Sequence, residues 1–210
     1  MATCAHCNAL VCETTSREGA PKNCPCLATD EAREAARYTD EDKKAAREAA
    51  RVEAFGYCRL TRVEEIMEYA VRCGYKHLGV AFCLGLRREA RTFVDILLAN
   101  GFEVDSVCCK NGGVSKEVIG IKPEEYVNAG CEFEAMCNPA GQAAVLDEAG
   151  CQLNILLGLC VGHDTLFIKK SKAPVTVLAA KDRVTGHNPL APIYTSDSYY
   201  RKKLKNYVKK

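Results

Sequence analysis

Cysteine is the residue that most constrains how this chain can fold. The sequence has 210 residues, of which 14 are cysteine. Its first residues lack a charged segment followed by a long apolar run, and no apolar run is long enough to span a bilayer, so we expect a cytoplasmic protein without a membrane span. Thiols in that reducing compartment do not form lasting disulfides. We therefore expect most of the cysteines to bind metal and the others to be small buried hydrophobic residues.

Composition sets limits on the core and on the partners. Hydrophobic residues make up 48% of the chain, which is ordinary for a protein with a real core. The net charge of +2, from 29 basic and 27 acidic residues, creates no field that would attract nucleic acid or a membrane surface. We expect instead a redox partner protein or a small polar or anionic molecule. The oligomeric state stays open.

The first 28 residues are expected to form a cysteine-rich metal-binding segment. They hold few large apolar side chains, so they need an ion or a cross-link to fold. Closely spaced thiolates with a remote Cys–Pro pair are typical of iron–sulfur loops, which favours a cluster bound by Cys4, Cys7, Cys12 and Cys24. A tetrahedral zinc ion bound by Cys4, Cys7, Cys24 and Cys26 is the alternative.

Residues 29–56 are predicted to form a helical connector, and residues 57–210 are predicted to form an α/β domain. The connector is rich in helix formers and should break near Thr39, where Asp42 completes a capping box. Thr61 and Glu64 form another capping box, for a helix that Gly74 ends. Helices and short apolar strands then alternate, which predicts an open, mainly parallel, Rossmann-like sheet with helices on both faces. The expected strands are 77–82, 102–107, 152–159 and 175–180, and the helices between them are 86–100, 139–149 and 164–170.

Four cysteines of the α/β domain stand at strand ends or directly before a helix. Because all carboxyl ends of a parallel sheet share one edge, residues distant in sequence should meet there. Thiolates held on a rigid edge suit an iron–sulfur cluster or zinc. We expect a metal site formed by Cys83, Cys109, Cys137 and Cys160, with Cys58 as a fifth ligand or a nearby free thiol. Three other cysteines, Cys73, Cys131 and Cys151, lack this placement and are expected to be structural.

Polar residues accompany the thiols of this predicted edge. Lys110, His163 and Asp164 follow cysteines directly or closely and are candidate catalytic groups. Arg87 and Lys181 are candidate cofactor-binding residues, because their charge would offset that of a thiolate-bound cluster. Ordinary roles remain open for two of them: Asp164 as a helix cap and His163 as a partner of a carbonyl group.

The sequence resembles a family of uncharacterised, cysteine-rich, predicted metal-binding proteins, a domain of unknown function from anaerobic bacteria and archaea. The resemblance implies metal binding at Cys4, Cys7, Cys12 and Cys24 and at the cysteines of the sheet edge. Cys26 stands where relatives are expected to have methionine, which favours the ligand set with Cys12. The segments that carry the resemblance are CAHCNALVC, KNCP, GYCRLTRVEEI, GVAFCLGLRREA, CNPAGQA, GLCVGHD and KDRVTGHNP.

Three functions follow as hypotheses. The first is an iron–sulfur redox protein, carrying two [4Fe–4S] clusters, that transfers electrons or reduces a small polar molecule as an oxidoreductase. The second is a zinc-stapled module without enzymatic activity that senses a ligand or a protein. The third is a sulfur or metal trafficking protein that uses Cys58 or Cys108 as a transfer thiol.

Overall fold

The computed structural model describes residues 4–205 and residue 207. The chain divides into two compact units, Met1–Phe55 and Gly56–Lys210. In the first unit, short 3-10 helices precede two α-helices, α1 (Glu31–Ala35) and α2 (Asp40–Gly56), of which α2 ends at the boundary with the second unit. The predicted break between these helices is present, because Thr39 and Asp42 exchange hydrogen bonds at the start of α2. The 3-10 helices are Cys4–His6, Val11–Glu13 and Pro25–Ala28.

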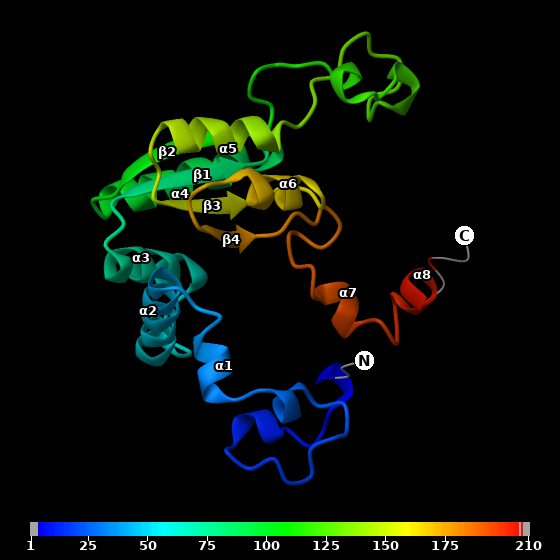
Figure 1. Cartoon of the computed structure of the whole chain (residues 1–210). Helices are drawn as coiled ribbons and strands as arrows, with labels where there is room; N and C mark the ends of the chain where they lie inside the picture. The colour runs from blue at the N-terminus through cyan, green and yellow to red at the C-terminus, as the bar shows by residue number, and fades with distance from the viewer. Residues whose placement is uncertain (1–3, 206, 208–210) are drawn as a thin grey trace. The chain divides into compact units, whose positions relative to one another are not determined.

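The second unit is built on a four-stranded sheet in which all neighbouring strands run parallel (Figure 1). Its strands are β1 (His77–Phe82), β2 (Glu103–Cys108), β3 (Leu153–Leu157) and β4 (Val175–Ala179). The order across the sheet is β2-β1-β3-β4, so β1 and β3 are the central strands. The α/β fold expected from the alternating helices and strands is therefore confirmed.

Helices cover both faces of this sheet and bury its apolar side chains. On one face, α3 (Arg62–Cys73) and α4 (Arg87–Ala99) pack against β1 and β3 through residues such as Ile66, Phe93 and Leu78. On the other, α5 (Pro139–Glu148) and α6 (His163–Lys170) contribute Leu146 and Phe167. Both faces of the central strands are thus buried, which explains why the β3 sequence is almost wholly apolar.

The helix boundaries follow from local capping. Thr61 and Glu64 form the predicted capping box of α3, which ends at Gly74 in the left-handed conformation. Asn138 accepts a hydrogen bond from the Gly141 amide at 2.9 Å and Pro139 opens α5, as expected. These caps set the ends of α3 and the start of α5, which is tied to the end of β2 by the hydrogen bond from the Asn138 backbone amide to the Cys109 carbonyl.

Some strand boundaries differ from the sequence expectation. The third strand was expected to reach residue 159, but β3 ends at Leu157. Gly158 adopts a φ of 66°, which lies outside the extended region, so the backbone turns there. The remaining strands agree with their predicted ranges to within one residue at each end.

A long insertion separates β2 from α5. Its two arms meet at an isolated antiparallel bridge between Ser115 and Ala135, and it contains 3-10 helices at Lys116–Ile119 and Pro123–Glu125. After β4 the chain continues into α7 (Ala191–Tyr194) and α8 (Arg201–Lys205). None of the helices in the described part of the chain has the length and apolar content needed to cross a bilayer.

Candidate metal centre at the carboxyl ends of the strands

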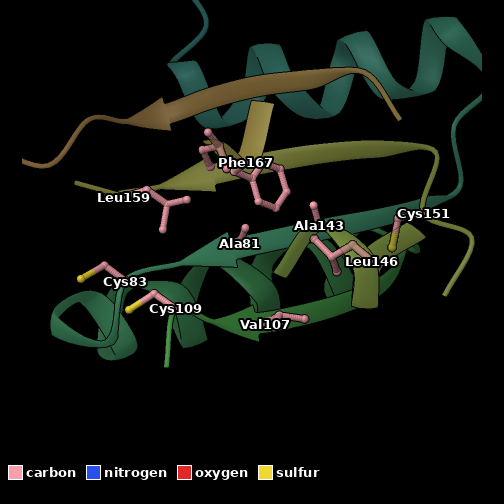
Figure 2. Close-up of a cluster of buried hydrophobic side chains, with 10 residues drawn as sticks. Ala81, Cys83, Val107, Cys109, Ala143, Leu146, Cys151, Leu159 and Phe167 are labelled. Carbon is pink, nitrogen blue, oxygen red and sulfur yellow. The ribbon is translucent and has the colours of Figure 1, made fainter. Parts of the chain in front are cut away.

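The four cysteines assigned to the sheet edge line one cavity of about 480 Å³. Cys83 follows β1, Cys109 follows β2, Cys160 lies beyond the end of β3, and Cys137 precedes α5. Figure 2 shows the side chains of Cys83 and Cys109 next to each other where their strands end. Cys83 and Cys109 are 7% and 3% exposed, so these thiols are withdrawn from bulk water. The cavity has the size of a small-molecule site.

Three of these thiols form a connected chain. Cys83 hydrogen bonds to Cys109, and the Sγ of Cys137 lies 4.0 Å from the Sγ of Cys109. The hydrogen bonds with Cys109 lower the pKa of Cys83 to about 4 and that of Cys137 to about 6. The pKa of Cys109 itself is raised, because it hydrogen bonds to both neighbouring thiols and is buried. The arrangement therefore favours thiolates at Cys83 and Cys137, the form that binds metal.

Cationic side chains approach these thiols from several sides. Lys181 hydrogen bonds to Cys83 and helps to lower the pKa of that thiol. A Cβ atom on Gly85 would lie 3.1 Å from the Nζ of Lys181, so glycine leaves room for the ammonium group. The charges of Lys110 and His163 act in the same way on Cys137. Negative charge at the thiols is thus offset within the cavity.

Cys160 is held separately by Arg183. The guanidinium Nη2 of Arg183 donates a hydrogen bond of 3.2 Å to the Cys160 Sγ, and this contact raises the pKa of Arg183. The carbonyl group of Cys160 accepts hydrogen bonds from the amides of His163 and Asp164 at the start of α6. The position of Cys160 is therefore fixed by both its backbone and its side chain.

The insertion between β2 and α5 supplies another part of the cavity lining. The ammonium of Lys110 donates to the Ala135 carbonyl, which ties the chain after β2 to the end of the insertion. An ion pair joins Lys116 to Glu134. The lining from the insertion is mixed, with apolar Ile119, Ile121, Val127 and Met136 beside Lys116, Glu125 and Glu134.

A buried glutamine joins the elements that carry three of the thiols. Gln142 on α5 is fully buried, and its Nε2 donates to the carbonyls of Phe82 at 3.2 Å and Val107 at 2.6 Å. These carbonyls lie at the ends of β1 and β2, one residue before Cys83 and two residues before Cys109. Gln142 therefore fixes the start of α5, and with it Cys137, relative to Cys83 and Cys109.

Not all residues singled out in the sequence meet in this cavity. Lys110, His163 and Lys181 line it together with the four cysteines. Cys58 is exposed in the turn after α2, and Asp164 accepts a hydrogen bond from the neighbouring Thr165 amide. Arg87 lines a different depression, formed with Arg91, Asp95 and other residues of α4, β1 and β2. None of these three is among the described residues that line the cavity.

Two cationic residues of the cavity, Arg183 and Lys116, were not among the residues predicted to form the site. Arg183 follows β4 at the same edge as Lys181, and its position after a strand was a usable signal. Lys116 lies within the insertion, where no helical or strand periodicity indicated its direction. No residue of the insertion was therefore predicted to belong to the site.

The thiols of the N-terminal unit also gather in one place. Cys4, Cys7 and Cys24 line a small depression together with Pro21, Asn23 and Pro25. Cys26 hydrogen bonds to Cys24, and the proximity of Cys24 and Cys12 helps to raise the pKa of Cys26. Both ligand sets considered from the sequence, with Cys12 or with Cys26, are compatible with this arrangement.

Comparisons with known proteins identify relatives without a known activity. A family model described as "Protein of unknown function (DUF1847)" matches residues 24–178. The chain is 46% identical over 201 residues to "Uncharacterized protein MJ0455" of Methanocaldococcus jannaschii, an alignment that covers 96% of this chain and 97% of that protein. No solved structure matches the chain. Any function must therefore be argued from the site itself.

Proposed function

We propose that this chain, which belongs to the DUF1847 family of proteins of unknown function, is a cytoplasmic iron–sulfur protein that transfers electrons one at a time. The observation that carries the proposal is the convergence of Cys83, Cys109, Cys137 and Cys160 on one cavity. Bound there, a [4Fe–4S] cluster would supply one-electron chemistry. The partner is a redox protein or a small polar or anionic molecule that enters the same cavity.

The spacing of the thiols does not by itself select a cluster or a single zinc ion. Four sulfurs around one zinc at about 2.3 Å lie roughly 3.8 Å from each other. Among residues 4–205 and 207, no three of these four cysteines have sulfur atoms that all lie within 4.8 Å of one another. The sulfur atoms of Cys109 and Cys137, 4.0 Å apart, match the zinc spacing, whereas the wider set of four suits a cluster, in which each thiolate binds a different iron.

The surrounding charges support the same proposal. A cluster with four thiolate ligands carries net negative charge, and its burial requires compensation. Lys181 contacts Cys83, Arg183 contacts Cys160, and Lys110 lies near Cys137. Proteins tune the reduction potential of a cluster through hydrogen bonds to its sulfur atoms and through its exposure to solvent. This cavity provides such donors and is partly closed.

The N-terminal unit is proposed to bind a second [4Fe–4S] cluster through Cys4, Cys7, Cys12 and Cys24. Its gathered thiols support this assignment. The N-terminal segment has few buried apolar residues of its own, since Val11 is the one buried residue among the described positions 4–28. A bound cluster would stabilise this segment.

Anaerobic purification followed by iron and sulfide analysis tests the proposal. We expect about eight iron atoms per chain and a visible absorption that dithionite bleaches. Cys83→Ser and Cys24→Ser should each lower the iron content to about half, through loss of one site. Cys73→Ser, which removes a buried thiol of α3, is the matched control and should keep the full iron content. A colourless wild-type protein that contains only zinc would overturn the proposal and favour the zinc-stapled module.

A further inference from the structure

A separate group of metal-ligating atoms lies at the amino ends of the strands. His77 is the first residue of β1, Asp105 lies within β2, and Cys151 precedes β3. The His77 Nε2 is 2.7 Å from the Asp105 Oδ2, and one ligand atom from each of the three residues lies within 4.8 Å of the other two. Figure 2 shows Cys151 at the opposite end of the buried cluster from Cys83 and Cys109.

The strand register places these three residues on one face of the sheet. Gly79 pairs with Asp105, and His77 lies two residues before Gly79, so His77 and Asp105 point to the same face. Cys151 packs into the buried cluster of that face, beside Leu146. Because β2, β1 and β3 are consecutive in the sheet, each strand brings one ligand to the same point.

Hydrogen bonds hold the backbone around these ligands. The side-chain oxygen of Gln152 accepts from the amides of Lys76 at 2.7 Å and His77 at 3.1 Å, and the Gln152 amide donates to the His77 carbonyl. The Cys151 thiol accepts a hydrogen bond from the Asp105 backbone amide. The backbone that carries the three ligands is therefore held rigidly, as a preformed metal site requires.

Charge and exposure also suit a cation. The carboxylates of Asp105 and Asp147 both lie near the buried thiol of Cys151. A divalent ion would offset this concentration of negative charge and stabilise the thiolate. The Asp105 side chain is 51% exposed and that of His77 is 23% exposed, so water has access to these two ligands.

We propose that His77, Asp105 and Cys151 bind one divalent ion of the zinc type, with water as the fourth ligand. One nitrogen, one oxygen and one sulfur donor are the ligand types that zinc accepts in tetrahedral sites. The ion would cross-link the amino ends of β2, β1 and β3. This site shares no ligand with the proposed clusters, so its test does not depend on whether those clusters are present.

Cadmium-113 NMR of the anaerobically purified protein tests the site. The chemical shift of bound Cd²⁺ reports the number of sulfur ligands, so a one-sulfur site is distinguished from a site with four thiolates. We expect one resonance of the one-sulfur type after addition of one equivalent of Cd²⁺. Zinc should displace this signal. His77→Ala and Asp105→Ala, which change partly exposed side chains, should weaken binding by more than about 100-fold and remove the resonance.

Two thiol variants complete the test. Cys151→Ser should also remove the one-sulfur resonance, and Cys73→Ser, at another buried thiol, should retain it. Wild-type protein that shows only all-thiolate resonances would overturn the proposal. So would a one-sulfur resonance that persists unchanged in His77→Ala and Asp105→Ala, a result that does not depend on whether Cys151→Ser folds.

Discussion

The sulfur atoms of Cys109 and Cys137 lie 4.0 Å apart although 28 positions separate the two residues in the sequence. The insertion leaves the sheet directly after Cys109 and returns at Cys137, where α5 begins. The Asn138 amide donates to the Cys109 carbonyl at 2.7 Å, so the two ends of this excursion are joined at the site. Cys109 is therefore the central one of three hydrogen-bonded thiols, with Cys83 on one side and Cys137 on the other.

This central position predicts how the thiols react in the metal-free, reduced protein. Cys83 and Cys137, with their pKa lowered to about 4 and about 6, should be thiolates at pH 7, whereas the raised pKa of Cys109 keeps it protonated. Alkylation of Cys137 should therefore be nearly constant above pH 7 and decline as the pH falls through about 6. For Cys83 the decline should come near pH 4.

Mass spectrometry of peptides after timed iodoacetamide treatment measures these profiles. The pH dependence is the readout, because burial slows the absolute rate at Cys83, and exposed Cys131 serves as an internal reference. An alkylation rate at Cys137 that still rises about tenfold per pH unit through pH 7 would contradict the connected arrangement.

Arg183 should tune the potential of the sheet-edge cluster. Its hydrogen bond and its charge at Cys160 favour the more negative, reduced state. Arg183→Gln should therefore make the midpoint potential more negative, by on the order of 50 mV. An EPR-monitored redox titration measures this shift. Arg87→Gln is the matched control, since Arg87 lines a different depression and its loss should leave the potential unchanged.

Gln142 should matter for both stability and cluster retention. Gln142→Leu keeps a similar volume but leaves the Phe82 and Val107 carbonyls without their side-chain donor. We expect the free energy of unfolding to fall by about 1–3 kcal/mol and iron to be lost faster from the strand ends during chelation. Urea unfolding and timed iron release measure the two effects. Glu148→Gln, on the exposed end of α5, should change neither.

Much of this architecture was accessible from the sequence because its signals are local. Alternating apolar segments, the capping boxes at Thr39 and Thr61, and Asn138 before Pro139 predicted the helices and the parallel strands. The same reading placed Cys83, Cys109 and Cys160 at one edge, since carboxyl ends of parallel strands coincide.

The parts that escaped prediction depend on side-chain direction and on irregular backbone. Arg87 starts α4 near Cys83 in sequence, yet its side chain lines another depression. Lys116 reaches the cavity from an insertion without periodicity. The proximity of His77, Asp105 and Cys151 depends on the strand order β2-β1-β3, which periodicity does not encode.

An anomalous-scattering map, recorded at the iron edge from anaerobically grown crystals, would locate any iron bound by these thiols. We predict an iron peak enclosed by the sulfur atoms of Cys83, Cys109, Cys137 and Cys160, and a second among the N-terminal thiols. A cavity at the strand ends that holds zinc alone, or no iron at all, would contradict this prediction.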